Sequence, residues 1–239
     1  MKNMETIALK GNGQVRQGRT EIDVPYNDGK ITFVQPLVGP NYHAEVMGSI
    51  DSQGLLRPTT AQTLSLVDLA MQNPDEAHCK EILERFRKNY LWTSTESLSF
   101  PEGVIVYDNV DGKMPSTSKE LMKLADKNDP RARFVQRGFK TGEMRISEFL
   151  EHPYTVAQVG EDMLPVVQRV AEQLNKKYAY IYGLDEASQD TKRFTAVYVY
   201  VDRLLLCGDY RGGGRVGCAS GVLNTGEASR AKSKRAKKK

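Results

Sequence analysis

Apolar residues recur at helical spacing in the first half of the chain, and they predict two main helices. The first begins at Thr59 or Thr60, which follow a proline and can cap it, and ends at the Asn-Pro-Asp break of residues 73–75. In the second, charged residues separate the apolar positions. The apolar positions of the two helices are Leu64, Val67, Leu69 and Met71, then Ile82, Leu83 and Phe86. A shorter helix is expected over residues 41–54, where a glycine ends it.

Aromatic and β-branched residues predict strands elsewhere along the chain. Residues 90–109 favour two strands joined by a turn at Pro101 to Gly103, and residues 178–184 alternate as a strand does. Further strands are expected at 29–38 and in the last 30 or so residues before the tail. Residues 111–176 have a mixed and mainly helical pattern.

No internal repeat and no linker divides the chain, so the sequence predicts one domain. We place this domain at residues 26–225, with a lead-in of residues 1–25 before it and a tail of residues 226–239 after it. No apolar run approaches the length of a membrane helix, and the N-terminus lacks the apolar region of a secretory signal. A cytoplasmic protein without a membrane span is therefore expected.

The net charge of +4 comes entirely from the tail. Residues 228–239 hold seven Lys or Arg and no acid, and the rest of the chain holds 27 basic against 30 acidic residues. Such a run of like charges repels itself, so the tail is expected to be disordered. It either binds nucleic acid or another anionic surface by counterion release, or it only keeps the protein in solution.

A glycine-rich stretch near the C-terminus, "VDRLLLCGDYRGGGRVGCASGVL" (residues 201–223), matches no common catalytic motif. It lacks the Lys-Ser/Thr end and the following helix of a phosphate-binding loop. Its cysteines, Cys207 and Cys218, have no His or Cys neighbour at metal-ligand spacing. Main-chain hydrogen bonds hold a β-strand whatever its side chains. We interpret the stretch as a strand, a turn and a strand whose side chains are free to differ.

Nothing in the sequence predicts catalysis, a metal or a cofactor. The three histidines, His43, His78 and His152, are scattered, and none has a second histidine three or four residues away. The nucleophile motif G-x-S-x-G is absent, and three cysteines do not suggest a disulfide framework. A non-enzymatic protein is therefore expected.

Two stretches, in this order, resemble the C-type-lectin-like fold. "LLRPTTAQTLSLV" (residues 55–67) opens the first main helix, and "YLWTSTESLSF" (residues 90–100) follows the second. They are similar to the helix start and the tryptophan-bearing strand of these domains, a fold shared by relatives of formylglycine-generating enzymes and by many bacterial and phage binding domains. In that fold the chain closes with a strand ending in Gly-Val-Arg-Leu or Gly-Phe-Arg. Here "GVL" (residues 221–223) stands in that place, with Leu223 instead of the arginine.

The resemblance implies an α+β fold of small twisted antiparallel sheets flanked by two main helices, with residues 111–176 as a helical insertion. It also implies that several residues of the two stretches support the fold rather than react. These scaffold residues are Arg57, Trp92, Thr93, Ser94, Thr95 and Glu96. The single tryptophan is expected to pack inside.

The motif order further resembles the variable proteins of diversity-generating retroelements in uncultured archaea and small-genome bacteria. Those proteins carry their changeable residues just ahead of the last strand. Adenine-directed mutagenesis of an AAC codon cannot produce Lys, Glu, Gln, Met or Trp, and none of these occurs from Phe194 to Gly226. Strands and glycine-rich turns disfavour Lys and Glu in any case, so a plain strand-turn-strand explains the absence as well. We define residues 194–223 as the C-terminal segment.

The resemblance implies a ligand-binding protein whose binding face lies in the C-terminal segment, with another macromolecule, most simply a protein, as ligand. Tyrosine and arginine are effective contact residues. The expected contact residues are Tyr198, Tyr200, Asp202, Arg203, Leu205, Cys207, Asp209, Tyr210, Arg211, Arg215, Cys218 and Ser220.

The sequence leaves two alternative functions open. A nucleic-acid-associated protein would use the basic tail with Arg203, Arg211 and Arg215. An enzyme on a formylglycine-generating-like fold would require a reactive cysteine pair or a copper site, with Cys207 and Cys218 close enough to bond. A separation of their Cα atoms beyond about 7 Å would exclude a disulfide between them.

Overall fold

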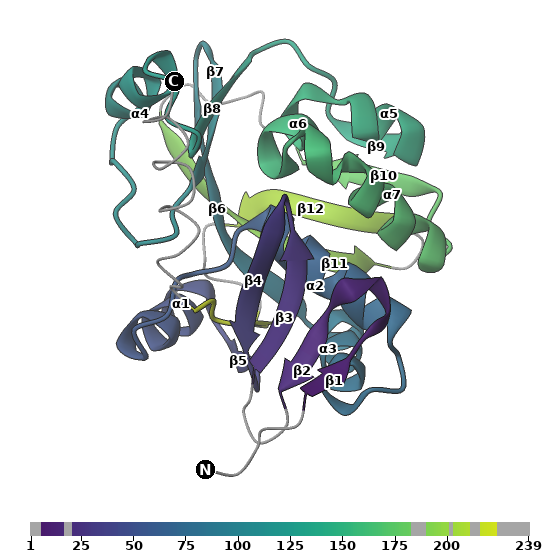
Figure 1. The fold of residues 1–239 in the computed structure, drawn as a ribbon. Helices are drawn as coiled ribbons and strands as arrows, with labels where there is room; N and C mark the ends of the chain where they lie inside the picture. Colours follow the sequence, from purple (N-terminus) through teal and green to yellow (C-terminus); the bar gives the residue numbers. More distant parts are fainter. Residues whose placement is uncertain (1–5, 17–20, 183–189, 201–202, 211–215, 224–239) are drawn as a thin grey trace, which may run out of the picture.

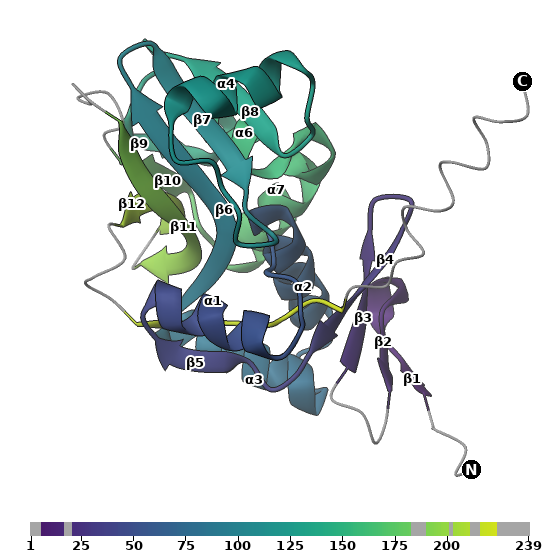
Figure 2. The same ribbon diagram turned by 90° about the vertical axis from the view of Figure 1, so that its left-hand side faces the viewer.

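The protein folds as a long mixed sheet with helices on both faces and a second, small sheet beside it (Figure 1). The computed structural model describes residues 6–16, 21–182, 190–200, 203–210 and 216–223. Figure 2, turned by 90°, shows the small sheet standing apart on one side, with two helices between it and the main sheet.

Nine strands form the main sheet, in the order β5-β13-β6-β11-β12-β10-β9, with β7 paired to β6 and β8 paired to β7. The bounds of these strands are β5 (Val38–Asn41), β6 (Tyr90–Phe100), β7 (Gly103–Asp108), β8 (Ala132–Gln136), β9 (Gly142–Arg145), β10 (Tyr178–Ile181), β11 (Thr191–Tyr200), β12 (Arg203–Tyr210) and β13 (Gly217–Ala219). The long strand β6 is the centre of the sheet, since it pairs with β7, β11 and β13. The strands predicted at residues 90–109 are confirmed as β6 and β7.

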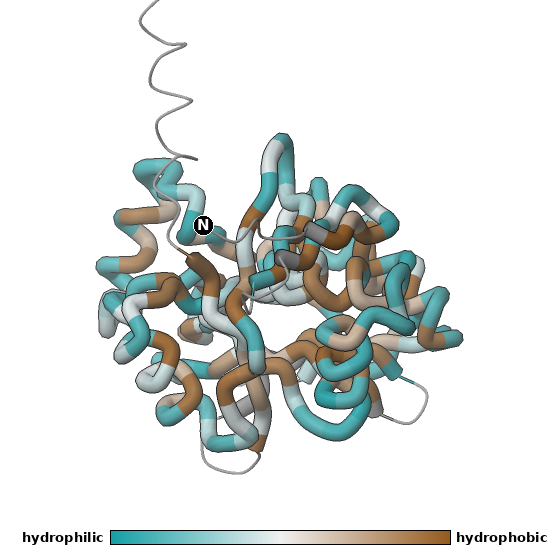
Figure 3. The backbone as a smooth tube through the Cα atoms, turned by 60° about the horizontal axis from the view of Figure 1, so that its bottom comes forward, coloured by the Kyte–Doolittle hydropathy of each residue, from teal (hydrophilic) through white to brown (hydrophobic). Residues whose placement is uncertain are grey.

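The three helices predicted in the first half are confirmed. The helices are α1 (His43–Ser52), α2 (Thr60–Gln72), α3 (Ala77–Lys88), α4 (Ser118–Asp126), α5 (Ile146–Glu151), α6 (Pro153–Val159) and α7 (Leu164–Gln173), with 3-10 turns η1 (Lys10–Asn12) and η2 (Glu161–Met163). Thr59 caps α2: its hydroxyl accepts from the Gln62 backbone N–H at 3.2 Å, and the Gln62 side chain accepts from the Thr59 N–H at 2.9 Å. Brown apolar and teal polar positions alternate along the helices in Figure 3, as expected of elements with one buried face.

Three hydrophobic clusters are buried among the described residues, and the two largest lie on opposite faces of the main sheet. The larger one packs α2, α3, α6 and α7 against one face, where Leu91 of β6 and Val197 of β11 are buried. The smaller one packs α1 against the other face, where Trp92 of β6 and Tyr198 of β11 are buried. Alternate residues of β6 and β11 therefore enter different cores, as the two-residue period of a strand requires.

The small sheet is antiparallel, in the order β1-β2-β3-β4, and belongs to the larger core. Its strands are β1 (Thr6–Ala8), β2 (Gln14–Arg16), β3 (Glu21–Tyr26) and β4 (Gly29–Val34). β3 and β4 form a hairpin in which Ile22 pairs with Phe33. The domain boundary expected at residue 26 falls inside this hairpin, so the lead-in and the residues after it share one sheet.

The closing residues of the chain join the two sheets. Val222 bridges Phe33 of β4 on one side and Leu56 on the other. Both hydrogen bonds between the backbones of Val222 and Leu56 are 2.9 Å, and the Leu223 N–H donates to the Thr32 carbonyl at 2.9 Å. The "GVL" element therefore does close the fold, and it does so by pairing with the small sheet.

Residues 111–176 form helices α4 to α7, in line with the predicted helical pattern, but they also supply two strands, β8 and β9, which the pattern did not predict. β9 begins at Gly142 and forms one edge of the main sheet. Its four residues are too few for alternation to be visible in the sequence.

Candidate ligand-binding face

The C-terminal segment forms β11, β12 and β13, and β6 holds two of these strands in place. β11 lies between β6 and β12, and β13 lies on the other side of β6. Main-chain ladders join them, with Ala196 of β11 paired to Trp92 of β6 and to Cys207 of β12. The backbone of the segment is therefore fixed by its neighbours.

Both faces of this part of the sheet are covered, and this limits which side chains reach the surface. Val197, Leu204 and Leu206 enter the larger core. Ala196, Tyr198 and Leu205 enter the smaller core beneath α1. A strand has two alternating rows of side chains, and the sequence did not reveal that α1 packs over the second row.

Four of the expected contact residues are consequently buried: Tyr198 is 6% exposed, Leu205 2%, Cys218 0% and Ser220 3%. The Ser220 hydroxyl donates to the Val34 carbonyl at 2.5 Å and accepts from the Gln35 side chain at 3.1 Å. A buried side chain offers a ligand no surface, so these four residues do not contribute to a binding face.

Arg203 is the one expected contact residue whose described side chain is partly exposed. Its guanidinium lies 2.5 Å from a carboxylate oxygen of Glu143 on β9, and 5.8 Å from the ring centre of Tyr180 on β10. Asp202, Arg211 and Arg215 lie outside the described residues, and for Tyr200, Cys207, Asp209 and Tyr210 the description covers the backbone alone. The contact role of these seven residues stays a prediction.

Aromatic rings form a row across the second face of the sheet. The ring centres of Trp92 and Tyr90 are 5.5 Å apart, and those of Tyr90 and Tyr198 are 4.1 Å apart. The Tyr198 hydroxyl lies 3.2 Å from the Tyr182 hydroxyl, and the rings of Tyr182 and Tyr180 are 4.8 Å apart. The row is buried at Trp92 and half-buried at Tyr180, so it connects the core beneath α1 to the surface at β10.

Trp92 anchors the buried end of this row. Its indole N–H donates to the Asn41 carbonyl at 3.1 Å, and His43 of α1 packs edge-on against it at 5.4 Å between ring centres. Gly217 of β13 leaves room for the indole, because a Cβ at Gly217 would lie 2.8 Å from the Trp92 ring nitrogen and 2.6 Å from the Tyr90 carbonyl. Gly217 is therefore a position of the C-terminal segment that cannot change freely.

The two stretches that carry the resemblance meet in a buried polar network. The Thr95 hydroxyl accepts from the Thr60 N–H at 2.9 Å and donates to the Asp108 carboxylate at 2.7 Å. The hydroxyls of Thr60 and Thr93 are 3.0 Å apart, and Thr93 donates to the Thr195 carbonyl at 3.1 Å. The network ties the start of α2 to β6 and β11.

Two further residues of the stretches bind the loops around this network. The Ser94 N–H donates to the Pro58 carbonyl at 2.7 Å. Arg57 makes two hydrogen bonds to Asp51, at 2.9 and 2.5 Å. This charged pair raises the pKa of the Arg57 guanidinium, so Arg57 stays cationic.

Glu96 is the buried charge of the network. It is 1% exposed, accepts from the Asn109 amide at 2.9 Å, and forms an ion pair with Lys192 of β11. The Lys192 side chain is 44% exposed and lies over the Phe194 ring, with its nitrogen 5.2 Å from the ring centre. A surface lysine therefore neutralises a carboxylate inside the sheet.

Lys192→Met is expected to lower the free energy of unfolding by about 2 kcal/mol, because it leaves the Glu96 carboxylate buried without its cation. We expect a smaller loss of stability than for a fully buried ion pair, because the Lys192 side chain is partly exposed to water. Adding Glu96→Gln should restore most of the stability, because an amide carries no charge to compensate. Urea unfolding of both single variants and the double variant measures the coupling. A double variant no more stable than Lys192→Met would contradict the expectation.

The described residues give no support to the enzyme alternative. Cys218 of β13 and Cys207 of β12 are separated by β6 and β11, so three strand spacings of about 4.8 Å lie between their backbones. That exceeds the reach of a disulfide. Burial is the main cause that raises the pKa of Cys218, and it raises that of Cys79 to about 12. Both thiols are thus held in their unreactive protonated form.

Histidines and acids do not assemble into a reactive or metal-binding group either. His43 is buried, which lowers its pKa, and its Nε2 donates to the Thr93 carbonyl at 3.0 Å. Across the part of the chain that the structure describes, no three His, Cys, Asp or Glu side chains are grouped to hold a metal. Within the same residues, no helix is both long enough and apolar enough to cross a membrane.

Sequence reasoning missed the residues that surround Arg203. Tyr178 and Tyr180 lie on one face of β10, Tyr182 comes directly after the strand, and their spacing of two in "YAYIY" was the signal that the sequence offered. Glu143 and Arg145 of β9 lie on the same face, paired with Tyr180 and Tyr178. Their position depends on a strand that the sequence did not predict.

One solved structure is similar to this chain over most of its length. It is described as "Accommodation of massive sequence variation in Nanoarchaeota by the C-type lectin fold", and it matches at 16% identity with a TM-score of 0.54. The match covers 76% of this chain and 94% of that chain. No family model matches the sequence, and the comparison with curated proteins finds no match. The protein has the C-type lectin fold, as its two motif stretches implied.

Proposed function

We propose that this protein is a non-enzymatic binding protein whose C-terminal segment is diversified by a retroelement and presents a changeable surface to a macromolecular ligand, most simply a protein. The observation that carries the proposal is the position of the segment within the fold. Its strands are held by main-chain ladders to β6 and β10, which lie outside the segment. Exchange of outward side chains therefore leaves the ladder in place.

Two further observations support the proposal. The solved structure with the same fold is described as accommodating massive sequence variation. The stretch from Phe194 to Gly226 also lacks the five amino acids that an adenine-mutagenised AAC codon cannot encode. Only those residues of the segment that lie outside both cores are proposed to vary, because packing fixes the residues inside a core.

The DNA beside the gene tests this proposal codon by codon. We expect a reverse transcriptase gene and a near-copy of the 3′ end that differs at adenines. The differences should fall in the codons of outward or undescribed positions, which are Tyr200, Asp202, Arg203, Cys207, Asp209, Tyr210, Arg211 and Arg215. The codons of Val197, Leu204 and Leu206 should be identical in both copies, because these side chains are buried.

Absence of both the reverse transcriptase and the near-copy would refute the diversification at this locus. Differences concentrated in the three core codons would refute the structural part of the proposal. The fold itself would be unaffected by either result, since it rests on the structure alone.

A further inference from the structure

An open sheet face lies beside the C-terminal segment. We name it the β9–β10 face and define it by Glu143, Arg145, Tyr178, Tyr180, Tyr182 and Arg203. Ala179 and Ile181 of β10 are buried in the larger core, so the three tyrosines between and around them lie on the opposite side of the strand. Met144 of β9 is likewise buried in the larger core, which places its two neighbours on the tyrosine side.

Helices pack on one side of β9 and β10, and among the described residues α1 alone reaches toward the tyrosine side. In Figure 2, β9, β10 and β12 lie at the outer margin of the molecule, with α6 and α7 on the inner side. α1 covers the part of this face near Trp92, and the tyrosines of β10 are half-buried. Tyrosines that are partly exposed on a rigid strand present large contact area with little conformational entropy to lose.

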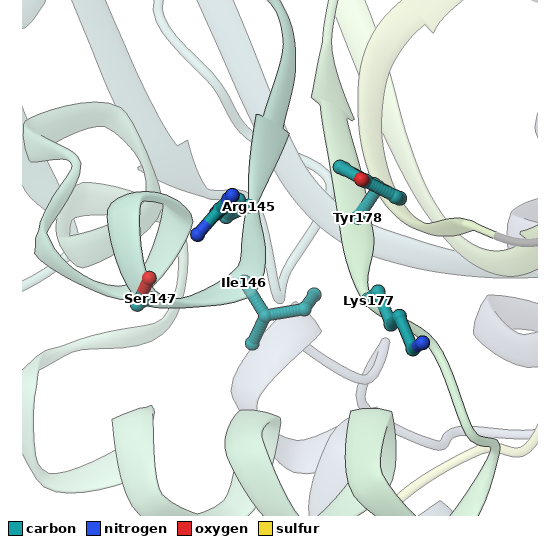
Figure 4. A pocket seen from close by; sticks show the side chains of 5 residues that line it. All are labelled: Arg145, Ile146, Ser147, Lys177 and Tyr178. Carbon is teal, nitrogen blue, oxygen red and sulfur yellow. The ribbon is translucent and has the colours of Figure 1, made fainter.

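Positive charge collects at one end of the face. Arg145 and Lys177 are exposed, and among the described residues neither has an ion-pair partner. Together with Ile146, Ser147 and Tyr178 they line a hollow of about 370 Å³ (Figure 4). The residues around the hollow therefore include two exposed cations that carboxylates of a ligand can reach.

A free strand edge distinguishes this face from a nucleic-acid platform. Glu143 stands beside Tyr180, and the guanidinium of Arg203 balances its charge, so this carboxylate does not discriminate between anionic ligands. β9 ends the main sheet, and within the described residues it pairs only with β10. Its outer main-chain groups can pair with an extended peptide, which is a mode that nucleic acid cannot use.

We propose that the β9–β10 face binds an extended acidic segment of a protein ligand, whose carboxylates reach Arg145 and Lys177 while its backbone lies along β9. Except for Arg203, the face lies outside the C-terminal segment. It deepens the proposed function, on which it rests, by supplying a constant half of the binding face beside a changeable half. Ligands of different variants would then share an acidic strand and differ in what they present to β12.

A peptide of alternating glutamate and threonine, labelled with fluorescein, tests the proposal on the full chain by fluorescence anisotropy. The matched peptide carries glutamine in place of glutamate, and oligothymidylate of equal charge serves as a competitor. We expect the glutamate peptide to bind at least about tenfold more tightly than the glutamine peptide, because only the former pairs with the cations.

The double variant Arg145→Gln, Lys177→Gln should weaken binding of the glutamate peptide by about tenfold. Lys119→Gln, which removes an exposed charge on α4, is the matched control and should change nothing. The double variant keeps the basic tail, so peptide held by the tail would bind wild type and variant equally. That result would overturn the proposal.

Tighter binding of oligothymidylate than of the peptide, lost in the double variant, would also overturn it and would assign the face to nucleic acid. The result of the binding experiment does not depend on the result of the codon comparison. Binding at the β9–β10 face can succeed where the C-terminal segment proves unvaried, and a varied segment can accompany a face that binds no acidic peptide.

Discussion

Trp92→Ala is expected to lower the free energy of unfolding by about 3 to 5 kcal/mol, the range for removing a buried aromatic side chain. Trp92 is 1% exposed and packs against Tyr90 and His43. The substitution removes these contacts and leaves the Asn41 carbonyl without its indole donor. Gly217 cannot fill the space, since it has no side chain. Urea denaturation, followed by circular dichroism, measures the loss.

Phe134→Ala on β8 is the matched control for this substitution. Phe134 is also aromatic and lies on a strand of the same sheet, but it is 38% exposed, so its removal should cost about 1 kcal/mol or less. Equal losses for the two variants would mean that Trp92 is not an anchor of the fold. A Trp92→Ala protein that keeps its stability but loses a ligand would instead make Trp92 a contact residue.

Local features of the fold could be predicted from sequence because their causes are local. Thr59 caps α2 by pairing with a residue three positions away, and the Asn-Pro break that ends this helix is visible in the local sequence. The α+β fold class followed from the order of two motif stretches, and the structure adds that these stretches touch through Thr60 and Thr93. No periodicity indicates such a contact.

The candidate face was harder to predict, because burial depends on what packs over a strand. Tyr198 and Leu205 have an alternation that fits an outward row, yet α1, which is far from them in sequence, covers that row. Arg203 was expected at the surface, but its partner Glu143 comes from β9, a strand of four residues. The charge and the exposure of these side chains depend on pairing between strands that are distant in sequence, and a single sequence does not reveal that pairing.

Leu206→Ala is expected to lower the free energy of unfolding by about 3 kcal/mol, although Leu206 lies within the segment proposed to vary. Leu206 is 2% exposed, pairs with Val197 of β11, and packs into the larger core. Truncation leaves a cavity that the neighbouring strands, held by their ladders, cannot close. The midpoint of urea unfolding should fall with an unchanged slope, since the surface exposed on unfolding is nearly the same.

Val216→Ala is the matched control, because Val216 is also an apolar residue of the C-terminal segment but is 45% exposed. Its substitution should change stability by less than about 0.5 kcal/mol. The difference between the stability losses of Leu206→Ala and Val216→Ala bears on which positions of the segment can vary. A segment that varies without unfolding the protein must confine its changes to positions like Val216 and spare positions like Leu206. Equal and small effects at both would mean that the ladder alone holds the strand and that every side chain of the segment is open to exchange.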